Sequence, residues 1–123
     1  MTAQTRTDDE LLARQLWAIG DIVRLRLLSF LPTDENCESG NNVSRLAEKL
    51  ELSQPTVSHH LRVLRQAGLV RNRKMCRDVF YWVDPEEADR VCNALRETFE
   101  VCRKRSTQAK ASPLSDTEST GEA

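Results

Sequence analysis

Apolar residues recur at intervals of three and four along most of the chain, which places them on one face of successive α-helices. Residues that break or end helices, namely Gly20, Pro32 and Gly68, separate the periodic stretches. The pattern predicts helices over residues 8–19, 21–31, 43–50, 54–67 and 85–105.

The third and fourth predicted helices are joined by a tight Glu-Leu-Ser connection. Ser53 is a good N-cap, and Pro55 is tolerated in the first turn because its missing N–H would have no partner there. Two β-prone segments follow, residues 69–74 and 79–83, around a basic MCRD turn. This order predicts a mainly α fold with a small β-hairpin, a winged helix-turn-helix, whose second helix of the pair enters the major groove of DNA.

One domain is predicted over residues 8–105, because 123 residues leave room for a single modest core. Residues 106–123 are rich in Ser, Thr and Pro without apolar periodicity, which predicts a disordered tail. The mean hydropathy is −0.55, and no apolar run approaches the roughly 20 residues that span a bilayer. The N-terminus lacks a basic-then-apolar signal, so we expect a cytoplasmic protein with no membrane partner.

The net charge of −1 conceals a strong asymmetry along the chain. Residues 45–77 carry eight Lys or Arg and two Glu, a net charge of +6, whereas the segments on both sides are acidic. A cationic block of this kind indicates a surface for a polyanion such as DNA, and the alternative is a charged face that only meets solvent.

The predicted helix over residues 54–67 has two different faces. Val57, Leu61 and Leu64 form an apolar stripe, and the opposite face carries polar and basic side chains suited to phosphates and base edges. His59 therefore points outward, while His60 lies beside the stripe as a packing residue. Adjacent helical residues point about 100° apart, so we do not expect these two imidazoles to share one metal ion.

The segment NNVSRLAEKLELSQPTVSHHLRVLRQAGLVRNRKMCRDVFYWVD resembles the DNA-binding core of the arsenic-repressor-like (ArsR/SmtB) regulators. The resemblance rests on the LAE-type helix, LSQPTVSHHLRVL, AGLV and a wing that ends in an aromatic pair. It implies a homodimeric repressor that binds an imperfect inverted repeat in double-stranded DNA, dimerises through its first and last helices and leaves DNA when an inducer binds. No cofactor is required for this activity.

The resemblance also assigns DNA-facing positions within the +6 block. It implies that Gln54, Pro55, Ser58 and His59 of the recognition helix face DNA. Thr56 and Arg62 lie on or beside the same outer face of this predicted helix and are added to the set. It also implies that four wing residues lie near the minor groove or the DNA backbone: Arg71, Arg73, Lys74 and Arg77.

The inducer site departs from the best-known family pattern. Many arsenic and cadmium sensors have a CVC box before the LAE-type helix, but the aligned residues here are Asn42, Val43 and Ser44, which supply no thiolate. Cys37, in the loop before them, is a candidate to replace part of that box. The last predicted helix contains no histidine, so the family's zinc-type site is not expected.

The remaining thiols leave several possibilities open. Cys92 and Cys102 are ten residues apart, about 15 Å along a helix, so one chain cannot place both on one ion. They are either small residues in the dimer seam or, with Cys37, parts of a two-thiol site for As(III) or a related metalloid, or of a persulfide or disulfide switch. Cys76, in the wing turn among basic residues, is either a redox-sensitive thiol or an ordinary turn residue.

Three classes of function therefore compete. The leading hypothesis is a DNA-binding repressor released by a thiol-directed inducer, with a redox-controlled or ligand-independent regulator of the same fold as the alternative. A winged-helix interaction module without DNA binding is disfavoured by the polar outer face of residues 54–67. An enzyme is not expected, since no Ser/His/Asp set, glycine-rich phosphate loop or carboxylate pair is evident.

Overall fold

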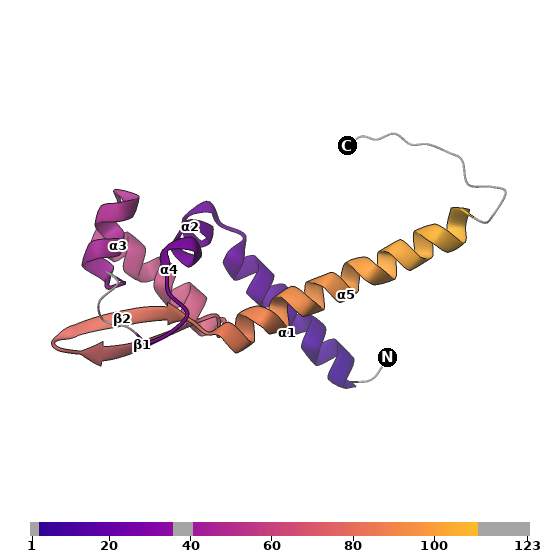
Figure 1. Ribbon diagram of the computed structural model, residues 1–123, viewed down its shortest axis with the longest axis horizontal. Coiled ribbons are helices and arrows are strands. Elements are labelled where there is room, and N and C mark those ends of the chain that lie inside the picture. Colours follow the sequence, from indigo (N-terminus) through magenta and orange to yellow (C-terminus); the bar gives the residue numbers. More distant parts are fainter. Residues whose placement is uncertain (1–2, 36–40, 111–123) are drawn as a thin grey trace. The chain divides into compact units, whose positions relative to one another are not determined.

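The computed structural model describes residues 3–35 and 41–110, which form five helices and one antiparallel hairpin (Figure 1). The chain divides into two compact units, residues 1–91 and 92–123. The elements are α1 (Ala3–Ile19), α2 (Ile22–Phe30), α3 (Val43–Leu50), α4 (Gln54–Gln66), β1 (Val70–Met75), β2 (Asp78–Val83) and α5 (Pro85–Lys110).

The predicted order of elements is confirmed, and four helices begin at capping side chains, including α5, where Asp84 accepts hydrogen bonds from the N–H groups of Glu86 and Glu87. Asp21 accepts hydrogen bonds from the N–H groups of Val23 and Arg24, Asn42 accepts one from Arg45, and Ser53 accepts one from Thr56. These caps satisfy N–H groups that have no partner within their own helix, which explains why the helix starts could be read from the sequence.

Two helix ends differ from the sequence-based prediction. Helix α1 begins at Ala3 rather than at residue 8, and α5 continues to Lys110 rather than ending near Arg105. Polar composition alone does not end a helix, and no glycine or proline interrupts residues 106–110. Thr107 instead donates its hydroxyl to the carbonyl of Arg103, within the helix. Residues 111–123 of the predicted tail lie outside the described residues.

The core of the first unit is built from all of its helices and the hairpin. Val57, Leu61 and Leu64 of α4 are completely buried, as the apolar stripe predicted. The buried hydrophobic cluster is Ala18, Leu27, Leu31, Leu46, Ala47, Val57, Leu61, Leu64, Leu69, Val70, Tyr81 and Val91. Burial of one face of α4 on this core leaves its opposite face on the surface.

Gln15 of α1 joins the end of α4 to the start of α5. Its side chain is only 2% exposed, and its amide nitrogen donates to the carbonyl of Ala67, at 3.1 Å, and to a carboxylate oxygen of Glu87, at 2.8 Å. One NH₂ group thus donates to two partly buried acceptors, one at the end of α4 and one at the start of α5.

We expect Gln15→Ala to lower the free energy of unfolding by about 1–3 kcal/mol, because it leaves the partly buried Ala67 carbonyl and Glu87 carboxylate without this donor. Urea denaturation followed by circular dichroism measures this change. Gln66→Ala, at an exposed glutamine of α4, is the matched control and should stay close to the wild-type value. Equal stability of the two variants would show that the Gln15 amide is not needed to hold these helix ends.

The hairpin forms the wing and is attached to the chain before α3. Strands β1 and β2 pair from Val70 opposite Val83 to Met75 opposite Asp78. The backbone N–H of Tyr81 donates to the carbonyl of buried Asn41, whose side-chain amide donates back to the carbonyl of Tyr81. These two hydrogen bonds attach β2 to the segment just before α3, which is the first helix of the helix-turn-helix.

The described part of the second unit, residues 92–110, is helical throughout. It exposes two large hydrophobic side chains, Phe99 at 61% and Val101 at 50%. Among the described residues, no helix is both long and apolar enough to cross a bilayer.

Candidate nucleic-acid interface

A tight turn orients α4 with respect to α3. Glu51 follows α3 in the left-handed conformation, with φ 57° and ψ 45°, and its N–H donates to the carbonyl of Glu48. The N–H of Leu52 then donates to the carbonyl of Ala47, at 3.1 Å, and Ser53 begins the next helix. The turn is therefore defined by backbone hydrogen bonds, although it contains no glycine.

The outer face of α4 meets the solvent as predicted. Its first turn begins at the Ser53 cap, whose hydroxyl also donates to the Thr56 hydroxyl at 2.8 Å. The side chains on this face are exposed, except that of Ser58, which is partly buried: Gln54, Pro55, Thr56, Ser58, His59 and Arg62. Polar and basic groups on the first turns of such a helix are suited to base edges and phosphates.

The predicted wing residues are also on the surface. Arg71, Arg73 and Lys74 are exposed on β1, and Arg77 is exposed in the turn that joins the strands. Cys76 and Arg77 have φ values of 53° and 77°, as in a type I′ two-residue turn. Since β1 packs against α4, the two sets of predicted DNA-facing residues belong to neighbouring elements of one unit (Figure 1).

One wing cation already has an acidic partner. A guanidinium nitrogen of Arg73 lies 3.0 Å from a carboxylate oxygen of Glu35, and both side chains are largely exposed. Glu35 was not singled out in the sequence, because it is 38 residues from Arg73 and belongs to a polar loop. A phosphate that approached Arg73 would compete with this carboxylate.

We expect Glu35→Gln to raise the affinity for DNA about two- to fivefold, since an exposed ion pair of this kind is worth little and is easily exchanged. Fluorescence anisotropy on labelled duplex at several salt concentrations measures the change. Asp34→Asn removes the same charge one residue away and is the control. An equal gain in both variants would mean that overall charge, rather than the contact with Arg73, is responsible.

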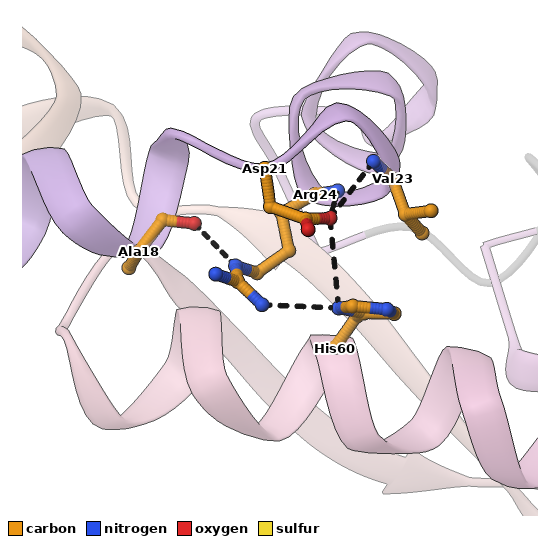
Figure 2. A network of polar contacts seen from close by, with 5 residues as sticks. All are labelled: Ala18, Asp21, Val23, Arg24 and His60. Carbon is orange, nitrogen blue, oxygen red and sulfur yellow. Dashed lines mark hydrogen bonds and ion pairs between the residues drawn. The ribbon is translucent and has the colours of Figure 1, made fainter.

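The two adjacent histidines have different surroundings. His59 is exposed, whereas His60 is partly buried against the corner between α1 and α2 (Figure 2). Arg24, only 7% exposed, donates its Nε–H to the carbonyl of Ala18, and its Nη1 lies 3.1 Å from Nδ1 of His60. A carboxylate oxygen of Asp21 is 3.9 Å from the same Nδ1. His60 thus lies beside the stripe, as predicted, but it also makes a specific polar contact.

The surroundings of this cluster favour neutral His60 and ionised Asp21. Burial lowers the pKa of His60, the carboxylate of Asp21 opposes this shift, and Arg24 and His59 add to it. The pKa of Asp21 is lowered mainly by the hydrogen bond from the N–H of Arg24. A guanidinium can only donate, so Nδ1 of His60 must be an acceptor and the ring proton must be on Nε2.

The buried Arg24 is a residue that the sequence reasoning missed. A signal for it was present, because Arg24 precedes Leu27 and Leu31 by three and seven residues and so lies on the buried face of α2. An arginine in register with a buried stripe indicates a desolvated guanidinium that needs hydrogen-bond acceptors.

The candidate sensor thiols are not brought together within the described residues. Cys76, Cys92 and Cys102 are free and exposed, and Cys37 lies outside the described residues. In the parts of the chain that the structure describes, no group of three or more His, Cys, Asp or Glu side chains could hold a metal ion. The proposed pairings of these cysteines therefore remain predictions.

The fold, the polar outer face of α4 and the cationic hairpin define the chain as a winged helix-turn-helix transcriptional regulator. Residues 21–72 match the family model described as a bacterial regulatory protein of the arsR family. Together with the relatives described below, this match shows that the chain belongs to the ArsR family. Its fold and family are those of DNA-binding transcriptional regulators and not those of enzymes.

Proteins with similar sequences are also described as regulators or repressors. An uncharacterized HTH-type transcriptional regulator of Methanocaldococcus jannaschii, MJ1325, is 33% identical over 81 residues, which are 65% of this chain and 85% of the relative. A biofilm growth-associated repressor of Xylella fastidiosa is 32% identical over 99 residues, 77% of this chain and 82% of the relative.

A solution structure gives the corresponding likeness in fold. It is the homodimeric winged helix-turn-helix DNA-binding domain of Mb0332 from Mycobacterium bovis, a possible ArsR-family regulator. Its TM-score is 0.63 at 20% identity, and the match covers 85% of this chain and 93% of that domain.

Proposed function

We propose that the chain is a repressor that binds an imperfect inverted repeat in double-stranded DNA as a homodimer and leaves it when a thiol-directed inducer binds. The observation that carries the DNA-binding part is the division of α4 into a completely buried stripe and an exposed polar face beside a cationic wing. An exposed apolar face at the same place would have favoured docking of another protein instead.

The roles of the residues follow from their chemistry. Gln54, Ser58 and His59, near the start of α4, are within reach of base edges when this helix lies in the major groove. The wing side chains are long and cationic, so they suit phosphates or the minor groove and contribute affinity that depends on salt. The outer face of α4 therefore carries sequence preference, and the wing adds affinity of lower specificity.

A second copy of the chain accounts for the exposed apolar side chains. Trp17 of α1 is 67% exposed, and Phe99 of α5 is 61% exposed. Such large apolar groups at the surface favour an interface. The resemblance places dimerisation on the first and last helices, and the Mb0332 domain is described as homodimeric.

The remaining cysteines are the candidates for the inducer site, because Asn42, Val43 and Ser44 supply no thiolate in place of the CVC box and α5 has no histidine for the family's zinc-type site. Arsenite or a related metalloid bound by Cys37 and Cys102, with Cys92 as a further candidate, is the proposed inducer. A redox or persulfide switch is the second candidate, and the exposure of Cys76 at the tip of the wing favours it.

The experiment uses the fully reduced protein and labelled DNA from upstream of its own gene. Fluorescence anisotropy is measured with and without arsenite, and Cys102→Ser and Cys76→Ser are compared with the wild type. Tight binding that arsenite reverses in the wild type but not in Cys102→Ser supports the proposal. Binding that ignores arsenite and responds to an oxidant through Cys76 favours the second candidate. Absence of binding would favour the interaction module.

A further inference from the structure

The Arg24 guanidinium connects three segments of the first unit. It donates through Nε to the carbonyl of Ala18 near the end of α1, and through Nη1 to His60 on α4, at 3.1 Å. The same group lies 5.0 Å from the centre of the Trp17 ring. Figure 2 shows the side chain extending from α2 across the corner toward the imidazole.

This contact links the recognition helix to α2 by a directional polar interaction. Apolar contacts of Leu61 and Leu64 hold α4 on the core, but such contacts are not directional. A planar guanidinium that donates in two fixed directions limits the position of His60 along and around the axis of α4. His59, the adjacent residue, belongs to the DNA-facing set, so any rotation of α4 at His60 also moves that set.

We propose that Arg24 and His60 are positioning residues for DNA binding, because their hydrogen bond fixes the orientation of the recognition helix against the α1–α2 corner. This inference rests on the proposed function, since it concerns the same DNA-facing surface. Neither residue needs to contact DNA: each acts through the placement of α4.

A pH dependence follows from the chemistry of the contact. The charged or titratable groups that act on His60 are Asp21 and Arg24 from the corner and His59 from α4 itself, while α1 contributes the Ala18 carbonyl to the other side of the guanidinium. Protonated His60 has no lone pair on Nδ1 for Arg24, and it places a second cation beside the first. Asp21 keeps its charge in this range, because its own pKa is lowered from 3.8.

The sign of the pH effect is fixed by the direction of the shift. The pKa of His60 is lowered from its ordinary value of 6.5, so the hydrogen bond is intact above pH 6.5 and is lost as the pH falls through the lowered pKa. The folded state loses stability in the same direction, because the unfolded chain binds this proton more readily. Unfolding must therefore be measured alongside DNA binding.

The test compares the wild type with His60→Asn, His60→Leu and Arg24→Lys on the same labelled operator DNA between pH 8 and pH 5. Asparagine keeps an acceptor near the position of Nδ1 but does not titrate, leucine removes the acceptor, and lysine keeps the charge but not the two-directional fork. Thermal unfolding at each pH establishes that every variant is folded. Arg14→Ala, at an exposed arginine of α1 that lies on neither α4 nor the wing, is the control for the loss of a cation that does not contact His60.

We expect wild-type affinity to fall about tenfold from neutral to acidic pH, within the usual range of coupling between sites. His60→Asn should bind nearly as well as the wild type at pH 8 and lose this fall, whereas Arg14→Ala should keep it. His60→Leu and Arg24→Lys should bind about tenfold more weakly at pH 8 while folded. If His60→Leu does not fold, the comparison of the wild type with His60→Asn still tests whether protonation of His60 causes the loss of affinity at acidic pH.

Three outcomes would overturn the inference. Wild-type affinity in folded His60→Leu or Arg24→Lys would show that the contact does not position α4. The same fall with pH in His60→Asn as in the wild type would assign the titration to another group. Failure of the wild type to bind DNA at any pH would overturn the proposed function and this inference with it, so the two failures are distinguishable.

Discussion

Replacing His59 and Arg62 together by alanine is expected to weaken binding to operator DNA about 100-fold. The reason is that well-placed side chains at base edges and phosphates each contribute about 1–3 kcal/mol to discrimination or affinity. Both residues are exposed on the outer face of α4 and do not belong to the core, so the free energy of unfolding should change by less than about 0.5 kcal/mol. Anisotropy titrations on specific and scrambled duplexes, with urea denaturation, measure both quantities.

Arg14→Ala is the matched control for this pair. Arg14 is an exposed arginine of α1, so its loss removes a positive charge that lies on neither α4 nor the wing. It should change the affinity only slightly. Equal affinity of the wild type and the double variant would exclude the outer face of α4 as the DNA-reading surface, whereas a loss of stability would mean that the two side chains have a structural role.

Phe99→Glu is expected to convert the proposed homodimer into a monomer and to lower operator affinity by at least about 100-fold. Phe99 is 61% exposed in the single chain, and a carboxylate buried at a seam between two copies would be left unpaired. Loss of the dimer removes the gain that comes from joining two half-site contacts in one molecule. Light scattering after size exclusion measures the mass, and anisotropy measures the affinity.

Val101→Glu provides a close control on the same helix. Val101 is 50% exposed, but it lies about 200° around the helix from Phe99 and therefore off the face that Phe99 shares with Leu95 and Cys102 at intervals of four and three residues. The added charge is the same, so the dimer and the affinity should persist. Monomers from both variants would indicate that charge on α5, rather than one face of it, decides assembly. Dimers from both would exclude this face from the interface.

Much of the fold is readable from the sequence because its signals are local. Asp21, Asn42 and Ser53 mark helix starts within two or three residues of the N–H groups that they cap. The buried and exposed faces of α4 follow from spacing alone. The end of α5 at Lys110 does not follow from spacing, because Ser and Thr disfavour a helix only weakly and no glycine or proline stops it before that residue.

What the sequence did not reveal depends on residues far apart in the chain. Arg24 meets His60 across 36 positions, and Gln15 meets Glu87 across 72. Local spacing can show that a polar residue lies on a buried face, but it cannot name the partner that satisfies it. The sensor cysteines raise the same difficulty, because their neighbours in the proposed site belong to distant segments or to a second copy.

The tip of the wing illustrates how function and folding can favour different residues. Cys76 and Arg77 adopt positive φ, where the absence of a side chain is an advantage, so glycine at either position would suit the backbone better. The chain instead retains a thiol and a guanidinium at the outermost point of the hairpin. Glycine at either position should therefore stabilise the turn, but only by removing a thiol or a cation from the tip of the proposed DNA-binding wing, so that stability and function favour different residues there.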